Sequence, residues 1–298
     1  MEQKRQEKDA GIVFAEGVAV RGVSFIGDPK DGTALFVTRK MRGKLENLRG
    51  KTGCLVFAEE GLEIAKELGD GNTFVMTGNP VGEYGRLALR IAAEEEKVQA
   101  QRKHTLTPGG YWIGENVSIG KGARIEAGCL IDHDVSVGEG AVIGFGSVIR
   151  HANIGKDFRC GEHTMIGAPA YFPSGEGDDA FRIPAFGQVL IGDGMDLGCG
   201  VVIERGFNAD TVLGNHGMID AHVCIGHDVR IGDRVRIICG TSLAGLVTVG
   251  DDVYIGMNAA IKQRLTIGDG AQVGMGAIVI TNVKPGVKVF GNPATKSE

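Results

Sequence analysis

Proline and aromatic side chains are scarce in this chain of 298 residues, which has 8 prolines, 4 tyrosines and 1 tryptophan. Basic charge is not in excess, because the formal net charge is −5, and this disfavours a nucleic-acid partner. No stretch of about 18 apolar residues occurs, and the charged start, MEQKRQEKDAGIVF, lacks the apolar centre of a secretory signal. We therefore expect a cytoplasmic protein with no membrane span.

Cysteine is present but forms no pattern of metal ligands. The six cysteines are Cys54, Cys129, Cys160, Cys199, Cys224 and Cys239. None is part of a CxxC pair or of a zinc-type Cys/His spacing, so we interpret them as small apolar residues of a protein kept in a reducing compartment.

Glycine is abundant, with 49 residues, and it accompanies an aliphatic residue that returns every six positions. The repeat runs from Ile113 to Ile149, continues after a one-residue slip from Ile154 to Ile166, and returns from Ile191 to Ile203. Its longest unbroken run extends from Leu213 to Val279. Such repetition is typical of proteins in which each unit buries its apolar face by stacking on its neighbours.

The period of six predicts a fold. Six residues, at about 3.3 Å per residue, make one short strand and one turn, so three repeats close a triangular coil of roughly 18 residues. Stacked coils place the aliphatic residues in interior ladders, and Gly, Asn and Asp occupy corners that need unusual dihedral angles. The sequence therefore predicts a mainly β protein, a left-handed parallel β-helix preceded by a small α/β domain.

The period also predicts the domain boundaries and two insertions. Residues 1–105 contain short apolar runs and a helical pattern, which predict a small α/β domain with a linking helix. This domain is a candidate for nucleotide binding. The β-helix is expected over 106–283 and a short tail over 284–298. Two segments, 167–190 and 204–212, do not fit the ladder and should be extruded as loops, which commonly carry binding surfaces on rigid scaffolds.

His227 is the leading candidate for catalysis. It lies two residues after Ile225, so its imidazole should project from a coil surface, where it can accept a proton from an attacking amine or hydroxyl. Asp220 lies seven residues earlier and could orient the imidazole. The alternatives are a solvated surface histidine and a corner aspartate that binds local backbone N–H groups. His133 has the same phase as His227, so the local motif alone does not decide.

Two other kinds of chemistry fit less well. His222 and His227 have a spacing similar to that of the zinc-binding pair in β-helical carbonic anhydrases, but a catalytic zinc needs three protein ligands. No histidine lies between His163 and His216 to supply the third. The N-terminal segment also lacks a Gly-rich phosphate loop, which disfavours a nucleotidyltransferase. We expect no metal ion.

Three segments carry a resemblance to a known family: RIPAFGQVLIGDGMDLGCGVVIERG, DTVLGNHGMIDAHVCIGHDVRIGD and LAG. With the small N-terminal domain and the hexapeptide coils, they resemble UDP-3-O-acylglucosamine N-acyltransferase of lipid A biosynthesis over most of residues 11–281. The resemblance implies a homotrimer, with active sites between subunits, that transfers an acyl chain from acyl carrier protein to the amine of a UDP-sugar.

The same resemblance assigns roles to single residues. The family's catalytic histidine falls on His227 and its aspartate on Asp220. The backbone N–H that stabilises the thioester oxyanion falls on Gly245, eighteen residues after His227 and thus about one coil away. Together they imply direct attack by the amine on the thioester, with neither an acyl-enzyme nor a metal ion.

Three features differ from the family pattern. Where the family binds uracil, this chain reads FVTRKMR, in which Phe36 matches while Arg39 and Arg42 replace an asparagine and an aromatic residue. Arginines can stack on a base or bind a diphosphate. Arg264 stands where the family has a further histidine, and it is a candidate for phosphate contacts. The ending, VKPGVKVFGNPATKSE, resembles acetyl-CoA-dependent hexapeptide acetyltransferases, so the donor can be a CoA thioester.

From these patterns we expect an N-acyltransferase that uses acyl carrier protein or CoA thioesters as co-substrate, with no tightly bound cofactor. Its acceptor is expected to be a nucleotide-linked amino sugar. The alternatives are an acetyl-CoA-dependent sugar acetyltransferase and a non-catalytic β-helix that acts as a binding protein or scaffold.

Overall fold

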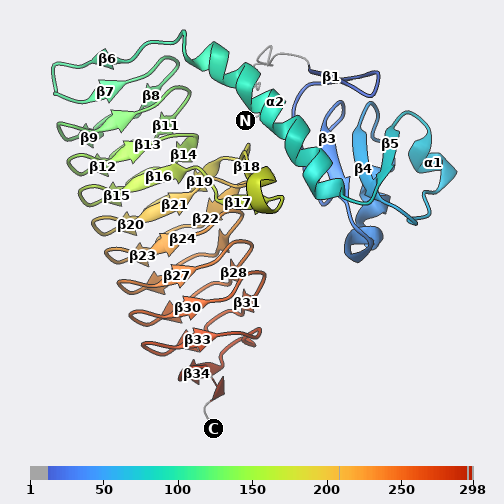
Figure 1. Cartoon of the computed structure of the whole chain (residues 1–298). Helices are drawn as coiled ribbons and strands as arrows, with labels where there is room; N and C mark the ends of the chain where they lie inside the picture. Colours follow the sequence, from blue (N-terminus) through green and yellow to red (C-terminus); the bar gives the residue numbers. More distant parts are fainter. Residues whose placement is uncertain (1–12, 208, 294, 297–298) are drawn as a thin grey trace. The chain divides into compact units, whose positions relative to one another are not determined.

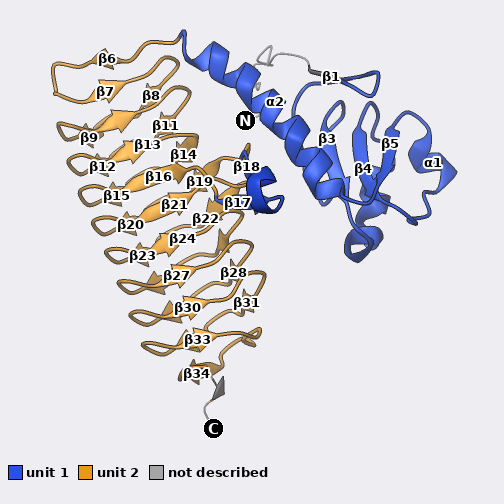
Figure 2. Cartoon of the chain, in the orientation of Figure 1, with its two compact units in different colours: residues 1–101, 171–184 blue, residues 102–170, 185–298 orange. Residues whose placement is uncertain are grey.

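The chain forms two compact units in a computed structural model that describes residues 13–207, 209–293 and 295–296 (Figures 1 and 2). Unit 1 is drawn from residues 1–101 and 171–184, and unit 2 from residues 102–170 and 185–298. The first insertion is thus divided between the units, because residues 171–184 belong to unit 1. Within the described residues, none of the helices combines the length and apolar character needed to cross a bilayer.

Unit 1 contains a three-stranded parallel sheet in the order β3-β4-β5. Its elements are β1 (Val13–Ala15), β2 (Val18–Val20), β3 (Ala34–Val37), η1 (Arg39–Leu48), β4 (Leu55–Glu59), α1 (Lys66–Gly69), β5 (Thr73–Thr77), α2 (Pro80–Gln99), β17 (Phe172–Ser174), η2 (Gly177–Asp179) and β18 (Phe181–Ile183). The apolar runs of the sequence became the strands, and the helical pattern became α2, which confirms the small α/β domain.

Helix α2 begins where its sequence provides a cap. The Asn79 side chain accepts the N–H of Gly82 at 3.0 Å, and Pro80 follows at the first helical position, where no N–H is needed. Tyr84, Leu87 and Ile91 recur at helical spacing and are buried. The hairpin β17–β18, from the first insertion, packs on this helix at Gly85, where a Cβ would meet the side chains of Phe181 and Ile183.

Unit 2 is a β-helix whose coils contribute short strands to three sheets (Figure 1). The strands pair in parallel except at the ends, where β6 pairs with β7 and β35 pairs with β34 in antiparallel register. The first face contains β6 (Thr105–Leu106), β7 (Trp112–Ile113), β10 (Leu130–Ile131), β13 (Val148–Ile149), β16 (Met165–Ala168), β21 (Val202–Glu204), β24 (Cys224–Ile225), β27 (Ser242–Leu243), β30 (Ala260–Ile261) and β33 (Ile278–Val279). The second face contains β8 (Ser118–Ile119), β11 (Ser136–Val137), β14 (Ala152–Ile154), β19 (Val189–Ile191), β22 (Thr211–Leu213), β25 (Arg230–Ile231), β28 (Thr248–Val249) and β31 (Thr266–Ile267).

The third face reaches into the segment that the sequence predicted as a tail. It contains β9 (Arg124–Ile125), β12 (Val142–Ile143), β15 (Arg159–Cys160), β20 (Asp196–Leu197), β23 (Met218–Ile219), β26 (Arg236–Ile237), β29 (Tyr254–Ile255), β32 (Gln272–Val273), β34 (Lys288–Phe290) and β35 (Thr295–Lys296). Because β34 pairs with β32 in parallel register, the coils continue past residue 283.

The aliphatic residue of each hexapeptide points inward and is buried, as the period predicted. Ile131, Ile149, Ile166, Ile203 and Ile225 are all 0% exposed and stack in one ladder behind the first face. The residue before each of them points outward, because side chains alternate along a strand. The apolar core of unit 2 is therefore one continuous column.

A ladder of side chains also joins the coils at the corner between the second and third faces. At this corner the residue two positions after the buried aliphatic accepts the N–H of the equivalent residue one coil earlier, at 2.7 to 3.0 Å. The accepting residues of this corner ladder are Asp193, Asn215, Asp233, Asp251 and Asp269. Each rung satisfies a backbone N–H that the turn would otherwise leave without a partner.

Candidate active site

His227 lies two residues after the buried Ile225, at the corner where the chain leaves the first face. Its Nδ1 lies 2.6 Å from Oδ2 of Asp228, the next residue, and its side chain is 15% exposed. Because an ionised carboxylate only accepts hydrogen bonds, the imidazole must donate from Nδ1, which leaves the lone pair of the neutral ring on Nε2. This is the tautomer that a general base needs.

Asp228 is held more firmly than a surface carboxylate. It adopts a left-handed backbone conformation with φ of 56°, and its side chain is 8% exposed. The N–H of Phe207 donates to Oδ2 and the N–H of Ala209 donates to Oδ1, each at 3.0 Å. Both carboxylate oxygens are thus engaged before the imidazole is counted, so the group that orients His227 is itself fixed.

Gly245 lies directly against the imidazole, one coil after His227. A Cβ at Gly245 would be 2.5 Å from Nε2 of His227, so a larger residue would displace the ring. The Gly245 carbonyl accepts the N–H of Arg264 at 3.1 Å, while its own N–H donates to no acceptor among residues 13–207, 209–293 and 295–296. An N–H beside an oriented base is the kind of donor that stabilises a developing oxyanion. The exposed Arg264 follows one coil later.

Asp220 is not brought to the imidazole within this chain. It follows β23 at the corner before the first face, whereas His227 follows β24 at the corner after it. The Asp220 carboxylate accepts the N–H groups of Ala221 at 2.7 Å and Cys239 at 3.3 Å, which is the local role given above as its alternative. A role at an imidazole would need a second copy of the chain and stays a prediction.

The three residues expected to bind a nucleotide lie in unit 1, at the end of β3 and in η1. Phe36 is half-buried, with its ring 5.2 Å from that of Tyr84. The Arg39 guanidinium donates to the carbonyl of Glu60 at 2.7 Å and pairs with Glu59, and Arg42 is exposed. Arg39 thus has partners within the protein, and a phosphate would have to compete with them.

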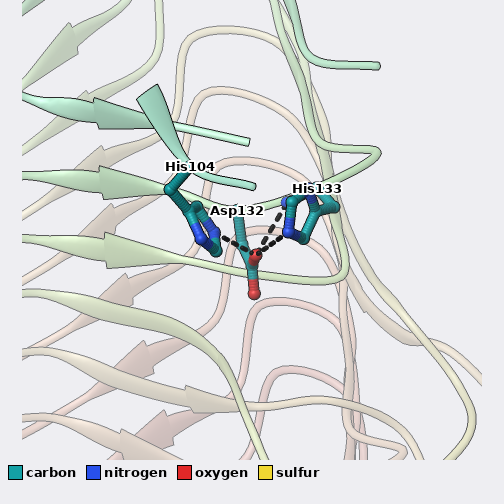
Figure 3. Close-up of side chains that lie close together, drawn as sticks. All are labelled: His104, Asp132 and His133. Atoms are coloured by element: carbon teal, nitrogen blue, oxygen red, sulfur yellow. Dashed lines mark hydrogen bonds and ion pairs between the residues drawn. The ribbon is translucent and has the colours of Figure 1, made fainter. Parts of the chain in front are cut away.

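One group of possible metal ligands occurs within the described residues, at the first coils of unit 2 (Figure 3). Oδ1 of Asp132 lies 2.8 Å from Nε2 of His104 and 3.9 Å from Nε2 of His133. However, Nδ1 of His133 accepts the N–H of Glu115 at 2.8 Å, whereas a metal-bound histidine normally donates from its second nitrogen. Arg150 also lies 3.3 Å from the same carboxylate. The arrangement fits a hydrogen-bonded junction better than a metal site.

The pKa values of this junction follow from its contacts. Burial alone would raise the pKa of Asp132, but hydrogen bonds from the His133 N–H and from His104, with the charge of Arg150, outweigh it and lower the pKa. The pKa of His133 is lowered, first by burial and then by the positive charge of Arg102 and His104. His133 is therefore held neutral at neutral pH.

Comparison with known proteins defines the class. The model of the bacterial transferase hexapeptide, six repeats, matches residues 116–151, and that of the hexapeptide repeat of succinyl-transferase matches residues 246–281. The LpxA structure from Acinetobacter baumannii, 22% identical, superposes with a TM-score of 0.59 over 65% of this chain and 74% of that one. This similarity confirms the predicted left-handed β-helix, and both model matches fall on its hexapeptide repeats.

Within this class the chain is similar to UDP-3-O-acylglucosamine N-acyltransferases. It is 39% identical over 84 residues to the protein of Neisseria gonorrhoeae (strain NCCP11945), covering 28% of this chain and 24% of that one. It is 41% identical over 146 residues to UDP-3-O-acylglucosamine N-acyltransferase 2 of Legionella pneumophila (strain Paris), covering 49% of this chain and 43% of that one. The matched part thus spans less than half the length of these curated relatives.

The residue that sequence reasoning missed is Asp228. It follows His227 directly, but Asp134 follows His133 in the same way, so the dipeptide carried no distinguishing signal. What distinguishes Asp228 is contact with Phe207 and Ala209, in the second insertion. The break in the period revealed the insertion in the sequence, but it did not reveal that the insertion contacts Asp228.

Proposed function

We propose that this protein is an N-acyltransferase that moves an acyl group from a thioester to the amine of a nucleotide-linked amino sugar. The names of the similar proteins, UDP-3-O-acylglucosamine N-acyltransferases, support this acceptor class. The observation that carries the proposal is the imidazole of His227, oriented by Asp228 on one side and packed against Gly245 on the other. Glycines also lie beside other histidine rings of unit 2, where the ring nitrogen they face is Nδ1. His227 instead has a glycine at Nε2 and, at Nδ1, a carboxylate that is held through both of its oxygens.

The mechanism follows from these three residues. The acceptor amine attacks the thioester carbonyl carbon, and Nε2 of His227 takes the proton that the amine loses. The carbonyl oxygen becomes an oxyanion that the N–H of Gly245 stabilises, and Asp228 stabilises the imidazolium. When the tetrahedral intermediate collapses, the C–S bond breaks and the imidazolium returns the proton to the leaving thiolate. The products are an amide and a free thiol, so no tightly bound cofactor is needed.

The remaining expected residues supply substrate contacts in this proposal. Phe36, Arg39 and Arg42 of unit 1 are proposed to contact the nucleotide, and Arg264, one coil after Gly245, a phosphate of the acceptor or of the donor. The donor is acyl carrier protein or a CoA thioester. Since nucleotide sugars and acyl thioesters are cytosolic metabolites, we place the protein in the cytoplasm.

We also propose that the protein is a homotrimer associated through the first face of unit 2. The outward residues of this face are mainly apolar, and Trp112 and Met165 are 46% and 40% exposed. The third face instead presents charged residues such as Arg124, Arg159 and Asp196. An exposed apolar face rimmed by polar ones is typical of an interface between subunits. Because His227 borders the first face, a neighbouring copy would lie beside it.

The proposal is tested by product mass. The purified protein is incubated with UDP-linked amino sugars and with both donor classes, and the increase in acceptor mass identifies the transferred group. His227→Ala should reduce the turnover by about two or more orders of magnitude. Undiminished transfer by that variant contradicts the mechanism, and no transfer by the wild type with any acceptor contradicts the activity.

A further inference from the structure

The second interruption of the hexapeptide period contacts the candidate site. Residues 205–207 and 209–210 lie between β21 and β22, and two of their backbone N–H groups, at Phe207 and Ala209, point at the carboxylate of Asp228. The Phe207 side chain is 6% exposed, and its ring packs edge-on at 6.2 Å from that of His227. This short loop therefore touches both members of the histidine–aspartate pair.

The return arm of the first interruption, residues 185–188, in turn fixes this loop. The N–H groups of Phe186 and Gly187 donate to the carbonyls of Phe207 at 2.8 Å and Gly206 at 2.9 Å. The Arg205 guanidinium donates to the Gly187 carbonyl at 2.6 Å, and the Gln188 N–H donates to the Asp210 side chain at 2.8 Å. These hydrogen bonds join the return arm of the first insertion to the second insertion.

Two glycines make this close approach possible. A Cβ at either Gly187 or Gly206 would fall on the carbonyl oxygen of Ala209. Because that oxygen is a backbone atom, it can move only if the loop moves. The loop, and with it the N–H groups aimed at Asp228, is therefore held by contacts that admit no side chain at these positions.

We propose that residues 185–188, 205–207 and 209–210 together act as a positioning device, which holds Asp228 so that His227 keeps its Nδ1–H tautomer and aims Nε2 at the substrate. The proposal rests on the proposed function of His227. A carboxylate with one fixed oxygen can still rotate, but N–H donors on both oxygens fix its plane. Precise orientation of this kind can change a rate strongly, since a displacement of about 1 Å can cost about 100-fold.

The test compares three glycine substitutions. Gly187→Ala and Gly206→Ala should each displace the Ala209 carbonyl, and we expect kcat of acyl transfer to fall about 10- to 100-fold with little change in KM. Gly192→Ala is the matched control, because its Cβ would lie 2.5 Å from Oδ1 of Asn215 and 2.6 Å from the Gly214 carbonyl, at a corner outside the site. It should lower the thermal midpoint while kcat stays within about twofold of wild type.

A second measurement reports on the device without any substrate. Nitrogen NMR of ¹⁵N-histidine-labelled protein distinguishes the two imidazole tautomers, and the spectrum of His227→Gln identifies the His227 signals. We expect one tautomer in wild type and in Gly192→Ala, and a mixture in Gly187→Ala and Gly206→Ala. An unchanged His227 spectrum and kcat in those two variants overturns the proposal, as does an equal loss of kcat in the control. If His227→Ala keeps full activity while the spectra still change, the proposed function fails but the positioning stands.

Discussion

Two histidine–aspartate pairs occupy the same position on different coils of unit 2, and their surroundings differ. His133 and His227 each lie two residues after a buried isoleucine of the first face, and an aspartate follows each. His133 accepts the N–H of Glu115 from the preceding coil, in the same way as the rungs of the corner ladder, and Asp134 pairs with Arg102 at 2.6 Å. His227 instead pairs with Asp228 and lies over Gly245 of the following coil.

The comparison shows that the neighbouring coils decide the chemistry of a repeated dipeptide. When a backbone N–H points at Nδ1, the ring becomes a structural acceptor and its Nε2 carries the proton. When a fixed carboxylate faces Nδ1, the lone pair of the neutral ring is left on Nε2, which is what the proposed general base requires. In addition, Gly245 lies against Nε2 of His227, whereas Gly114 lies against the backbone N and Nδ1 of His133.

The largest expected effect separates the two histidines. His227→Gln should lower kcat by about two to four orders of magnitude, because glutamine cannot accept and return the proton. His133→Gln should leave kcat within about twofold, because that ring only satisfies a backbone N–H. Initial rates at saturating substrate measure both, and equal losses in the two variants would show that the distinction drawn here is wrong.

The next largest effect should separate Asp228 from Asp134, because one substitution should lower kcat and the other should lower stability. Asp228→Asn removes the charge that stabilises the imidazolium, and we expect kcat to fall by about one to two orders of magnitude. Asp134→Asn weakens a part-buried ion pair with Arg102, whose side chain is 11% exposed, so we expect a loss of stability of about 1–2 kcal/mol and normal kcat. Urea unfolding and steady-state rates test this, and the reverse pattern contradicts it.

A smaller difference in kcat is expected between substitutions of Gly245, beside the His227 ring, and Gly114, beside the His133 ring. Gly245→Ala should lower kcat about tenfold or more, because its Cβ would lie 2.5 Å from Nε2 of His227 and displace the ring. At Gly114 a Cβ would lie 2.5 Å from the backbone N of His133, so Gly114→Ala should cost about 1–3 kcal/mol of stability without a specific effect on kcat. A normal kcat for Gly245→Ala would count against its place at the site.

The smallest expected effect is a pH dependence of stability that belongs to His133. Its pKa is lowered from the ordinary value of 6.5, so the folded state disfavours the charged ring. Its contribution is therefore fully present above about pH 6.5 and is lost as the pH falls through the lower folded pKa. Urea midpoints between pH 8 and pH 5 should fall less steeply in His133→Gln than in wild type, and parallel profiles would contradict the assignment.

Much of the fold was predictable, because the period of six is a direct record of which residues face the core. Ile131 and Ile225 are buried as their phase required. The site was less predictable, since its contacts cross between coils and loops that the period does not describe. Asp228 is fixed by Phe207 and Ala209 from an aperiodic segment, and the location of Asp220 at another corner depends on how the coil turns.

The corner ladder bears on the order in which the coils of unit 2 unfold. Each rung, such as that from the Asp233 N–H to Asp251, joins only adjacent coils, so no bond in the ladder ties one end of the column to the other. We therefore expect the coils to open from the ends inward, so amide hydrogen exchange should be fastest in the terminal coils and slowest in the middle. His227 lies among interior coils, between the rungs Asn215 and Asp233, where we expect the scaffold to open least often.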